Sequence, residues 1–334
     1  SILVQSASGL QIKPILGMLS FSFAFSLPFT LLAIFPQKLQ SLPKSGNWMI
    51  TLRVILGFIA IAFSLKFLSV VDKAYHFNLL NRDIFLLIWF TLFLILSLYL
   101  FGLIRLPDGY LKGKNLKIRF LGLLFSGLSI YLVSGLFGNR LPYLAAYLPP
   151  LQETYYDLNS LSRQSFYEDN NVYDKELSNV KYSEILKLPY NLKGFFDYQE
   201  ALNYSKKNNK PMLLDFTGHG CVNCRDIESR VWPDDRVRDF LNNKYVLVSL
   251  YVDDKTKLSE KNWYVSKYDS KIKKTLGKQN ADFQITRFNN NAQPFYVVID
   301  PFSEKIVYKP WGYELDIDSY INHLSNGIKE FYGE

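Results

Sequence analysis

The two cysteines of the chain, Cys221 and Cys224, are separated by two residues in the segment FTGHGCVNCRDIESRVW. A pair with this spacing can form one reversible disulfide, but it cannot supply a framework of several bridges. The pair follows a predicted buried strand and stands at the start of a predicted helix, whose N-terminus stabilises an anion. We therefore predict that Cys221 ionises more easily and attacks disulfides, and that the shielded Cys224 resolves the mixed disulfide.

Two carboxylates lie close to these thiols in the sequence. Asp215 stands inside the apolar segment PMLLDF, six residues before Cys221, and Glu228 follows Cys224 by one helical turn. A buried carboxylate near the resolving thiol has a raised pKa and can exchange a proton during disulfide exchange. An acid within a buried strand is costly, which favours a function for Asp215. For Glu228 the residues alone favour an ordinary solvated position on a helix.

The dipeptide Gln293-Pro294 begins another predicted strand. Because proline has no N–H to donate, it belongs at the start or the edge of a strand. A cis bond at this point would bring the backbone before Pro294 against the cysteine pair, where a substrate chain can form hydrogen bonds. From the residues alone, an ordinary trans proline in a turn is favoured.

Two other interpretations of the cysteine pair compete with redox chemistry. A zinc site requires about four ligands, and His219 is the only other candidate near the cysteines, because His76 and His323 lie in a membrane loop and in the last helix. Two buried structural cysteines are the second alternative, but the position at a strand-to-helix turn favours redox chemistry. We therefore predict a redox-active disulfide with no metal and no cofactor.

The elements that must position these residues form an α/β pattern from Leu192 onward. The predicted strands are Pro211 to Gly218, Tyr245 to Asp253, Pro294 to Asp300 and Lys305 to Tyr313. The predicted helices are Phe196 to Lys207, Cys224 to Val231, Asp235 to Asn242 and Ile317 to Phe331. Strands that alternate with helices predict a central sheet covered on both faces.

Four apolar segments in the first part of the chain are long enough to cross a membrane. They cover about residues 15–35, 48–71, 84–104 and 119–137. The third has no charged residue, and at about 1.5 Å per residue it crosses a hydrocarbon core of about 30 Å. The second carries Arg53 and Lys66 towards its ends, from where long side chains can reach the headgroups. We therefore expect a multi-pass α-helical membrane domain over 1–138, a linker over 139–190 and an α/β domain over 191–334.

The loops predict the orientation of this chain in the bilayer. The segment Arg105 to Arg119 carries five Lys or Arg residues beside two apolar segments, and such loops face the cytoplasm. The α/β domain is then expected outside the cytoplasm, where disulfides persist. The net charge of +8 is explained by basic loops next to anionic lipid. We predict no nucleic acid binding, since no cluster of Lys and Arg coincides with a known binding fold.

Taken together, these motifs resemble the thiol:disulfide interchange proteins of the DsbD family. The resemblance rests on DFTGHGCVNCRDIE, QPFYVVID, FSLPFTLLAIFP and SLPKSGNWM, with the tandem of membrane segments. It implies a C-terminal thioredoxin-like domain that passes electrons outward to periplasmic acceptors. It also implies that Asp215 and Glu228 are acids near the active-site disulfide and that Pro294 is a cis-proline. Gln293, Pro294 and His219 are then expected to contact the substrate, although the resemblance assigns His219 no specific part.

The chain also departs from the family pattern. The family's membrane domain has more spans and its own cysteine pair, which takes electrons from cytoplasmic thioredoxin, and an N-terminal periplasmic domain reduces downstream partners. Here the membrane segments contain no cysteine, and Ser1 falls just after the expected place of the second one. We therefore expect the C-terminal portion of a bacterial inner-membrane protein. Thioredoxin would be its electron source through upstream cysteines, and periplasmic disulfide proteins or the N-terminal domain would be its acceptors.

Three functions compete for this sequence. The leading hypothesis is a membrane-bound thiol–disulfide oxidoreductase that acts as a reductant. A disulfide-forming oxidant is the second, and the redox potential of the cysteine pair distinguishes the two. The third is a membrane-anchored binding or holdase module with incidental cysteines, whose activity the substitution Cys221→Ser leaves intact.

Overall fold

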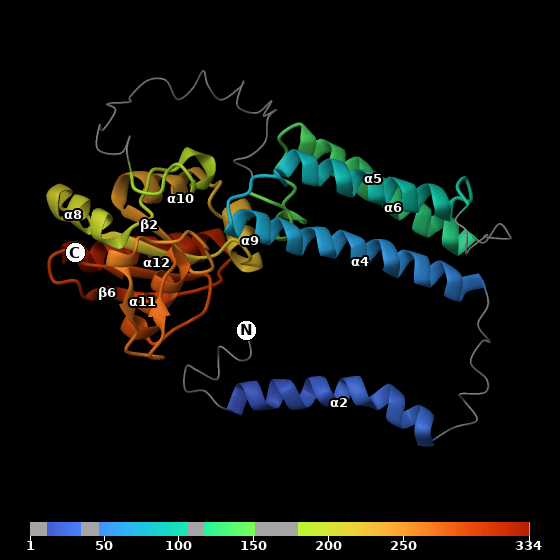
Figure 1. Ribbon diagram of the computed structural model, residues 1–334, viewed down its shortest axis with the longest axis horizontal. Coiled ribbons are helices and arrows are strands. Elements are labelled where there is room, and N and C mark those ends of the chain that lie inside the picture. Colours follow the sequence, from blue (N-terminus) through green and yellow to red (C-terminus); the bar gives the residue numbers. More distant parts are fainter. Residues whose placement is uncertain (1–11, 35–46, 106–115, 151–179, 334) are drawn as a thin grey trace.

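The computed structural model describes residues 12–34, 47–105, 116–150 and 180–333 (Figure 1). Its first part consists of the long helices α2 (Ile12–Ile34), α4 (Asn47–Ala74), α5 (Arg82–Leu100) and α6 (Leu116–Leu136). Its last part is an α/β domain. The expected loop 106–115, the loop 35–46 and most of the expected linker, 151–179, lie outside the described residues.

Three of the expected membrane spans are confirmed as helices of suitable length and composition. Among the described residues, Met49–Ala74, Arg82–Leu100 and Leu116–Leu136 are long and apolar enough to cross a membrane. The other expected span, 15–35, coincides with α2, in which Met18–Leu27 is a shorter apolar helical stretch. The membrane span over 15–35 therefore stays a prediction.

Helix α5 packs against α6 at small and hydroxylated residues and against α4 through Trp89. Ser97 on α5 donates a hydrogen bond to the carbonyl oxygen of Gly122 on α6 at 3.0 Å. A Cβ atom at Gly122 would lie 3.3 Å from Leu100 Cβ, so glycine permits the close crossing. Trp89 Nε1 donates to the carbonyl oxygen of Ala62 on α4 at 3.2 Å. Such small residues and interhelical hydrogen bonds are typical of helix packing in membranes.

The α/β domain is built on one four-stranded sheet in the order β2-β1-β5-β6. Its strands are β1 (Met212–Thr217), β2 (Val246–Tyr251), β5 (Phe295–Ile299) and β6 (Ile306–Trp311). Strands β1 and β2 are parallel, whereas β5 runs antiparallel to both β1 and β6. All four strands lie within the segments predicted from their apolar runs.

Helices cover both faces of this sheet, as the alternating pattern predicts. They are α8 (Tyr198–Asn208), α9 (Val222–Arg230), α10 (Asp235–Asp239), α11 (Leu276–Phe288) and α12 (Ile317–Tyr332). On one face Phe216 packs against Phe283 of α11, and on the other Tyr296 packs against Tyr320 of α12. The register pairs Asp215 with Tyr296, so Asp215 shares the face of α12.

Some elements were not predicted. Helix α11 was not predicted, because its buried side includes the polar residues Asn280, Asp282 and Gln284, which interrupt the apolar pattern. The two-residue strands β3 (Tyr264–Val265) and β4 (Ile272–Lys273) form a separate hairpin. Short turns of other helix types are η1 (Ala145–Tyr147), η4 (Pro189–Asn191), η5 (Phe240–Lys244) and η6 (Glu260–Asn262). The predicted helix 235–242 is therefore α10 continued by η5.

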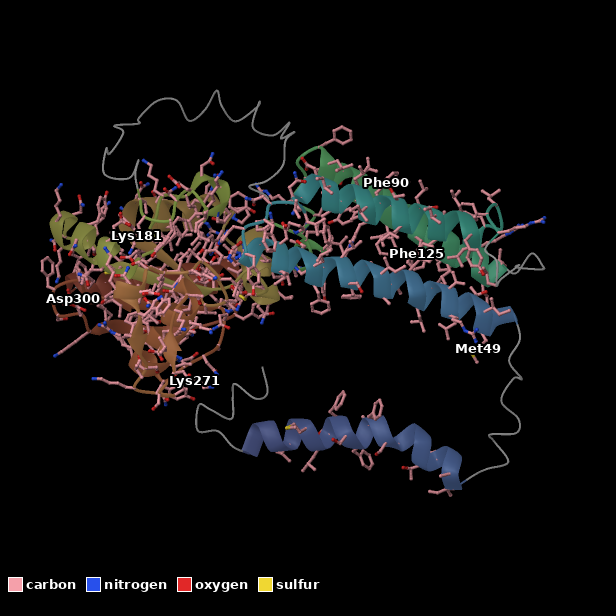
Figure 2. The ribbon with its side chains drawn as sticks, in the orientation of Figure 1. Met49, Phe90, Phe125, Lys181, Lys271 and Asp300 are labelled. Carbon is pink, nitrogen blue, oxygen red and sulfur yellow. A yellow bond between two sulfur atoms is a disulfide. The ribbon has the colours of Figure 1, made fainter. Side chains whose placement is uncertain are left out.

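The α/β domain contacts the membrane part at the C-terminal end of α4 (Figure 1) and at η1, which packs against α9. The amide of Lys255 donates to the carbonyl oxygen of Ala74 at 2.9 Å. Arg230 Nε donates to the carbonyl oxygen of Pro142 at 3.4 Å. Figure 2 shows Lys181, Lys271 and Asp300 around the outside of the α/β domain, away from this contact, with Phe90 and Phe125 on the helices. The start of α9, which carries the cysteines, therefore lies near the membrane helices.

Candidate functional site

Cys221 and Cys224 form a disulfide at the first turn of α9, with their Cα atoms 5.3 Å apart. Cys221 is the N-cap residue, and its Sγ accepts a hydrogen bond from the backbone N–H of Cys224 at 3.1 Å. Cys221 is half-buried, whereas Cys224 is only 1% exposed. The helix terminus and this N–H both favour negative charge on the first sulfur. The geometry thus agrees with Cys221 as the attacking thiol.

Asp215 lies in the middle of the sheet, on the central strand β1. It is 2% exposed, and its Oδ2 accepts a hydrogen bond from Ser249 of β2 at 2.8 Å. Burial raises the pKa of this carboxyl to about 6, although the Ser249 hydrogen bond and the charge of Arg225 oppose the change. A carboxyl in this range exchanges protons near neutral pH.

Glu228 is buried on the inner side of α9, one turn after Cys224. Burial raises its pKa to about 7, with an opposing effect from Arg225 and a further increase from Asp215. Arg225 Nη2 lies 2.7 Å from Glu228 Oε1. The solvated position that the residues alone favoured for Glu228 is therefore wrong, because α9 packs against η1 and Glu228 lines a small cavity with Arg82 and Leu148.

Arg225 is a site residue that the sequence analysis missed. It is 5% exposed, and its Nη2 donates to Thr217 Oγ1 at 3.3 Å. It also interacts with the hydroxyl of Tyr251, whose pKa is raised by burial. The spacing of Arg225 and Glu228 by three residues on one helix is a signal that would have suggested the ion pair. We call Asp215, Glu228, Arg225 and Tyr251 the buried acid–arginine cluster.

The Gln293–Pro294 peptide bond is cis. Pairing of Phe295 with Phe216 places Pro294 at the end of the sheet where β1 leads towards Cys221. The side chain of Gln293 donates to Gln284 Oε1 at 3.0 Å and to the carbonyl oxygen of Asn291 at 2.9 Å. This side chain is thus already engaged within the α/β domain.

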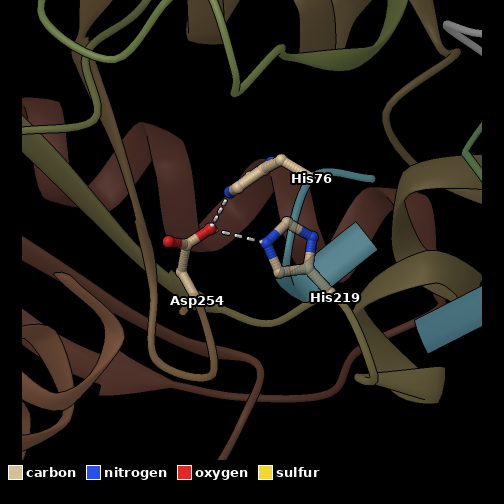
Figure 3. Close-up of side chains that lie close together, drawn as sticks. All are labelled: His76, His219 and Asp254. Atoms are coloured by element: carbon tan, nitrogen blue, oxygen red, sulfur yellow. Dashed lines mark hydrogen bonds and ion pairs between the residues drawn. The ribbon is translucent and has the colours of Figure 1, made fainter. Parts of the chain in front are cut away.

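His219 belongs to a second polar group, which includes a residue of the membrane part. Its Nε2 lies 2.9 Å from Asp254 Oδ2, and His76 Nε2 lies at the same distance from the same oxygen (Figure 3). The sequence analysis took His219 as the only histidine near the cysteines. The fold corrects this, because the segment after α4 brings His76 to it. We call His76, His219 and Asp254 the His–Asp–His cluster.

The segment just before Cys221 closes against α4. A Cβ atom at Gly220 would lie 3.2 Å from Val70 Cγ1, which leaves little room for a side chain. Asp253 accepts hydrogen bonds from the amides of His219 and Gly220 at 2.8 Å each. The approach to Cys221 is therefore bordered by a membrane helix on one side.

Comparison with known proteins supports the fold and the resemblance. A family model described as thioredoxin-like matches residues 191–301. The thiol:disulfide interchange protein DsbD of Vibrio cholerae is 22% identical over 247 residues, which are 74% of this chain and 33% of that protein. The DsbD of Vibrio vulnificus is 25% identical over 238 residues, or 71% of this chain and 32% of its own length. The chain thus spans about a third of the length of the curated relatives it matches.

Two solved structures are also similar to this chain. A DsbH oxidoreductase is 18% identical and covers 51% of this chain and 98% of its own, with a TM-score of 0.32. A thioredoxin from Thermus thermophilus is 18% identical and covers 42% of this chain and 92% of its own, with a TM-score of 0.31. The chain is thus similar to the DsbD proteins, and in it apolar helices of membrane-span type precede a thioredoxin-like domain with a Cys-x-x-Cys disulfide.

Proposed function

We propose that the chain is the electron-delivering part of a membrane-bound protein-disulfide reductase, which passes reducing equivalents to disulfides outside the cytoplasm. The observation that carries the proposal is the Cys221–Cys224 disulfide at the N-terminus of α9, together with the buried carboxyls of Asp215 and Glu228. Their pKa values are raised to about 6 and 7. The name of the curated relatives, thiol:disulfide interchange protein, supports the reaction class. Disulfide exchange needs no cofactor, because the sulfur atoms carry the electrons.

The reaction follows two exchange steps. The Cys221 thiolate attacks one sulfur of the acceptor disulfide, which forms a mixed disulfide and releases the first acceptor thiolate. The Cys224 thiolate then attacks Cys221 Sγ, which closes the Cys221–Cys224 disulfide and releases the second acceptor thiolate. Two electrons pass to the acceptor, whose thiolates take up two protons. A donor dithiol restores the reduced pair by the same exchange in reverse.

The buried acid–arginine cluster supplies the base for the second step. Cys224 is buried and must lose its proton before it attacks, and Glu228 lies on the same side of α9 one turn away. A carboxylate whose conjugate acid has a pKa of about 7 can take that proton at neutral pH. Arg225 keeps the cluster from binding protons still more tightly.

Main-chain atoms before Pro294 are the proposed substrate contact. The side chain of Gln293 is held by Gln284, so a bound acceptor chain would meet the backbone of Gln293 instead. The Gln293–Pro294 peptide lies at the end of the sheet where β1 leads towards Cys221. His219 precedes Cys221 in the sequence and bonds to Asp254, which also bonds to His76 of the membrane part. It is therefore better placed to hold the domain at the end of α4 than to bind acceptors.

The redox potential tests the proposed direction. The reduction potential of thioredoxin is about −270 mV, and that of the oxidant DsbA is about −120 mV. Equilibration of the detergent-solubilised chain with glutathione buffers should give a value nearer the first. A potential near the second would favour the disulfide-forming oxidant. Acceptor binding that persists in Cys221→Ser without any exchange would favour the binding module.

The proposed location rests on the loop charges and has its own test. We propose cytoplasmic thioredoxin as the electron donor and periplasmic disulfides as acceptors. Single cysteines introduced by Gly113→Cys or Asn326→Cys in a cysteine-free background report the sidedness in intact bacterial cells. An impermeant thiol reagent should label the second and spare the first. Labelling of the first would contradict the orientation.

A further inference from the structure

The His–Asp–His cluster brings together three ligand atoms from distant parts of the chain. His76 follows α4, His219 stands two residues before Cys221, and Asp254 follows β2 (Figure 3). The three atoms all lie within 4.8 Å of one another. The side chain of Asp254 is fully buried, and those of His219 and His76 are 10% and 17% exposed.

We propose that this cluster binds one divalent transition-metal ion of the zinc class, which joins the end of α4 to the thioredoxin-like domain. Two imidazole nitrogens and one carboxylate oxygen form a common donor set for zinc, and the fourth position is left to water. Around a tetrahedral ion with bonds of about 2.0–2.1 Å, ligand atoms lie about 3.3 Å apart. Each nitrogen lies 2.9 Å from the Asp254 oxygen, so these two pairs need only a small outward shift, and the two nitrogens lie within 4.8 Å of each other.

Neighbouring groups hold the ligands in this arrangement. The second oxygen of Asp254 accepts a hydrogen bond from the amide of Thr256 at 2.8 Å. The His219 ring packs against Tyr251 with a tilt of 32° between the rings and their centroids 4.7 Å apart. Metal ligands are usually fixed by such contacts from the next layer of residues. The site would therefore be largely formed before an ion arrives.

The charge around the cluster also suits a cation. Asp253 lies beside Asp254 and accepts the amides of His219 and Gly220, so two carboxylates meet at this point. With both imidazoles neutral, the local charge is negative and favours a dication. A hydrogen-bonded bridge without any ion is the competing arrangement, in which both imidazoles donate to one carboxylate oxygen.

The consequence is a crosslink beside the disulfide. His76 belongs to the membrane part, whereas His219 and Asp254 belong to the domain that carries the cysteines. A bound ion would hold the domain at the end of α4 in addition to the bond from the Lys255 amide to Ala74. This inference does not depend on the direction of electron transfer, and it can be tested in the absence of any exchange reaction.

The test is metal binding by the full chain in detergent, purified with a tag that contains no histidine. The protein is kept oxidised, because both cysteines are then in the disulfide and offer no thiolate. Zn²⁺ alone is titrated by calorimetry, and Co²⁺ reports tetrahedral geometry through its visible absorption. We expect one ion per chain. His76→Gln and His219→Gln should each weaken binding by roughly 100-fold or more, since loss of an outer partner alone costs roughly 10- to 100-fold.

The third histidine of the chain provides a matched control. His323 lies on α12, stacked on Trp311 with ring centroids 5.1 Å apart, and takes no part in the cluster. His323→Gln should bind Zn²⁺ like the wild type. Zn²⁺ should also slow hydrogen exchange of the Lys255 amide in the wild type and in His323→Gln, but not in His219→Gln.

The proposal is overturned if the oxidised wild type binds no stoichiometric Zn²⁺, or if neither histidine variant of the cluster weakens binding. Either result would leave the hydrogen-bonded bridge as the cluster's arrangement. Asp254→Asn is a third variant, checked by circular dichroism because Asp254 also fixes Thr256. If it does not fold, the two histidine variants still decide the question.

Discussion

The two polar clusters beside the disulfide differ in where their residues come from. The buried acid–arginine cluster is drawn from β1, β2 and α9, all within the α/β domain. The His–Asp–His cluster includes His76, which belongs to the membrane part. Tyr251 lies between them, since it interacts with Arg225 through its hydroxyl and packs against His219 through its ring.

This difference separates two requirements of the site. The reactivity of the thiols depends mainly on burial and charge inside the α/β domain, although Arg82 and Arg140 of the membrane part line the same cavity as Arg225 and Glu228. The position of the domain depends on a few contacts at the end of α4, so it should change without altering the thiols. Substitutions in one cluster should therefore leave the property of the other largely intact.

The largest effect is expected from the cysteines themselves. Cys221→Ser should reduce disulfide exchange to the background rate, because serine is not a nucleophile towards disulfides under these conditions. Cys224→Ser should still attack but accumulate a mixed disulfide with the acceptor. Non-reducing electrophoresis with a model disulfide protein distinguishes the two. Accumulation of the mixed disulfide in Cys221→Ser instead would reverse the two assignments.

Asp215→Asn and Glu228→Gln should slow exchange at pH 7 by roughly 10- to 100-fold, towards the lower range of general acid–base effects. The amides keep the shape of the side chains but cannot take the proton of Cys224. The exchange rate of the wild type should also rise through about pH 6 to 7, where the raised pKa values lie. Stopped-flow kinetics with circular dichroism as the folding control measures this. Unchanged rates in folded variants would make both acids structural.

Stability should respond to Asp215 in the opposite sense to activity. The folded-state pKa of about 6 exceeds the ordinary value of 3.8, so the folded state binds this proton more tightly. That contribution is complete below about pH 4 and is lost as the pH rises through about 6. Between pH 4 and pH 8, the free energy of unfolding should therefore shift by about 2 kcal/mol in favour of Asp215→Asn. Urea unfolding of the full chain in detergent, followed by tryptophan fluorescence at pH 4 and pH 8, measures the free energies. An equal difference between the variant and the wild type at the two pH values would contradict the prediction.

The smallest effect is expected at the contact with α4. Gly220→Val would crowd Val70, and overpacking of this kind costs about 1–3 kcal/mol. Hydrogen exchange of the Lys255 amide, which bonds to Ala74, should become faster. The amide of Val246, which bonds to Pro211 inside the α/β domain, is the internal control. Faster exchange at both amides would mean that the domain itself is disturbed, and the two requirements would not be separable.

Much of the fold follows from local patterns in the sequence. The four sheet strands and the helices α8, α9 and α12 lie where their apolar runs and amphipathic spacing predict them. Helix α11 was missed because tertiary contacts bury its polar residues, for example Asp282, which accepts a hydrogen bond from Tyr264 at 3.0 Å. A pattern based on apolar residues cannot detect a helix whose inner side is polar.

The candidate site was predictable in part for the same reason. The Cys-x-x-Cys pair, Asp215 and the cis Gln293–Pro294 bond were identified from the motif, the apolar strand and the family resemblance. Arg225 was overlooked, and so was the burial of Glu228 that the residues alone argued against. The positions of Arg225 and Glu228 both depend on which side of α9 is buried. A helix of nine residues that is rich in polar side chains gives little indication of its buried side.

By itself the sequence determined the apolar membrane segments, the types of most elements and the redox pair at a helix start, because these depend on neighbours within one or two turns. Only the tertiary structure decided the environment of that pair. The pKa values of Asp215 and Glu228 result from burial and from a shared arginine. The meeting of His76 with His219 and Asp254 results from the contact between α4 and the α/β domain. Electrostatics and ligand geometry depend on residues far apart in the chain, and no local pattern specifies their distances.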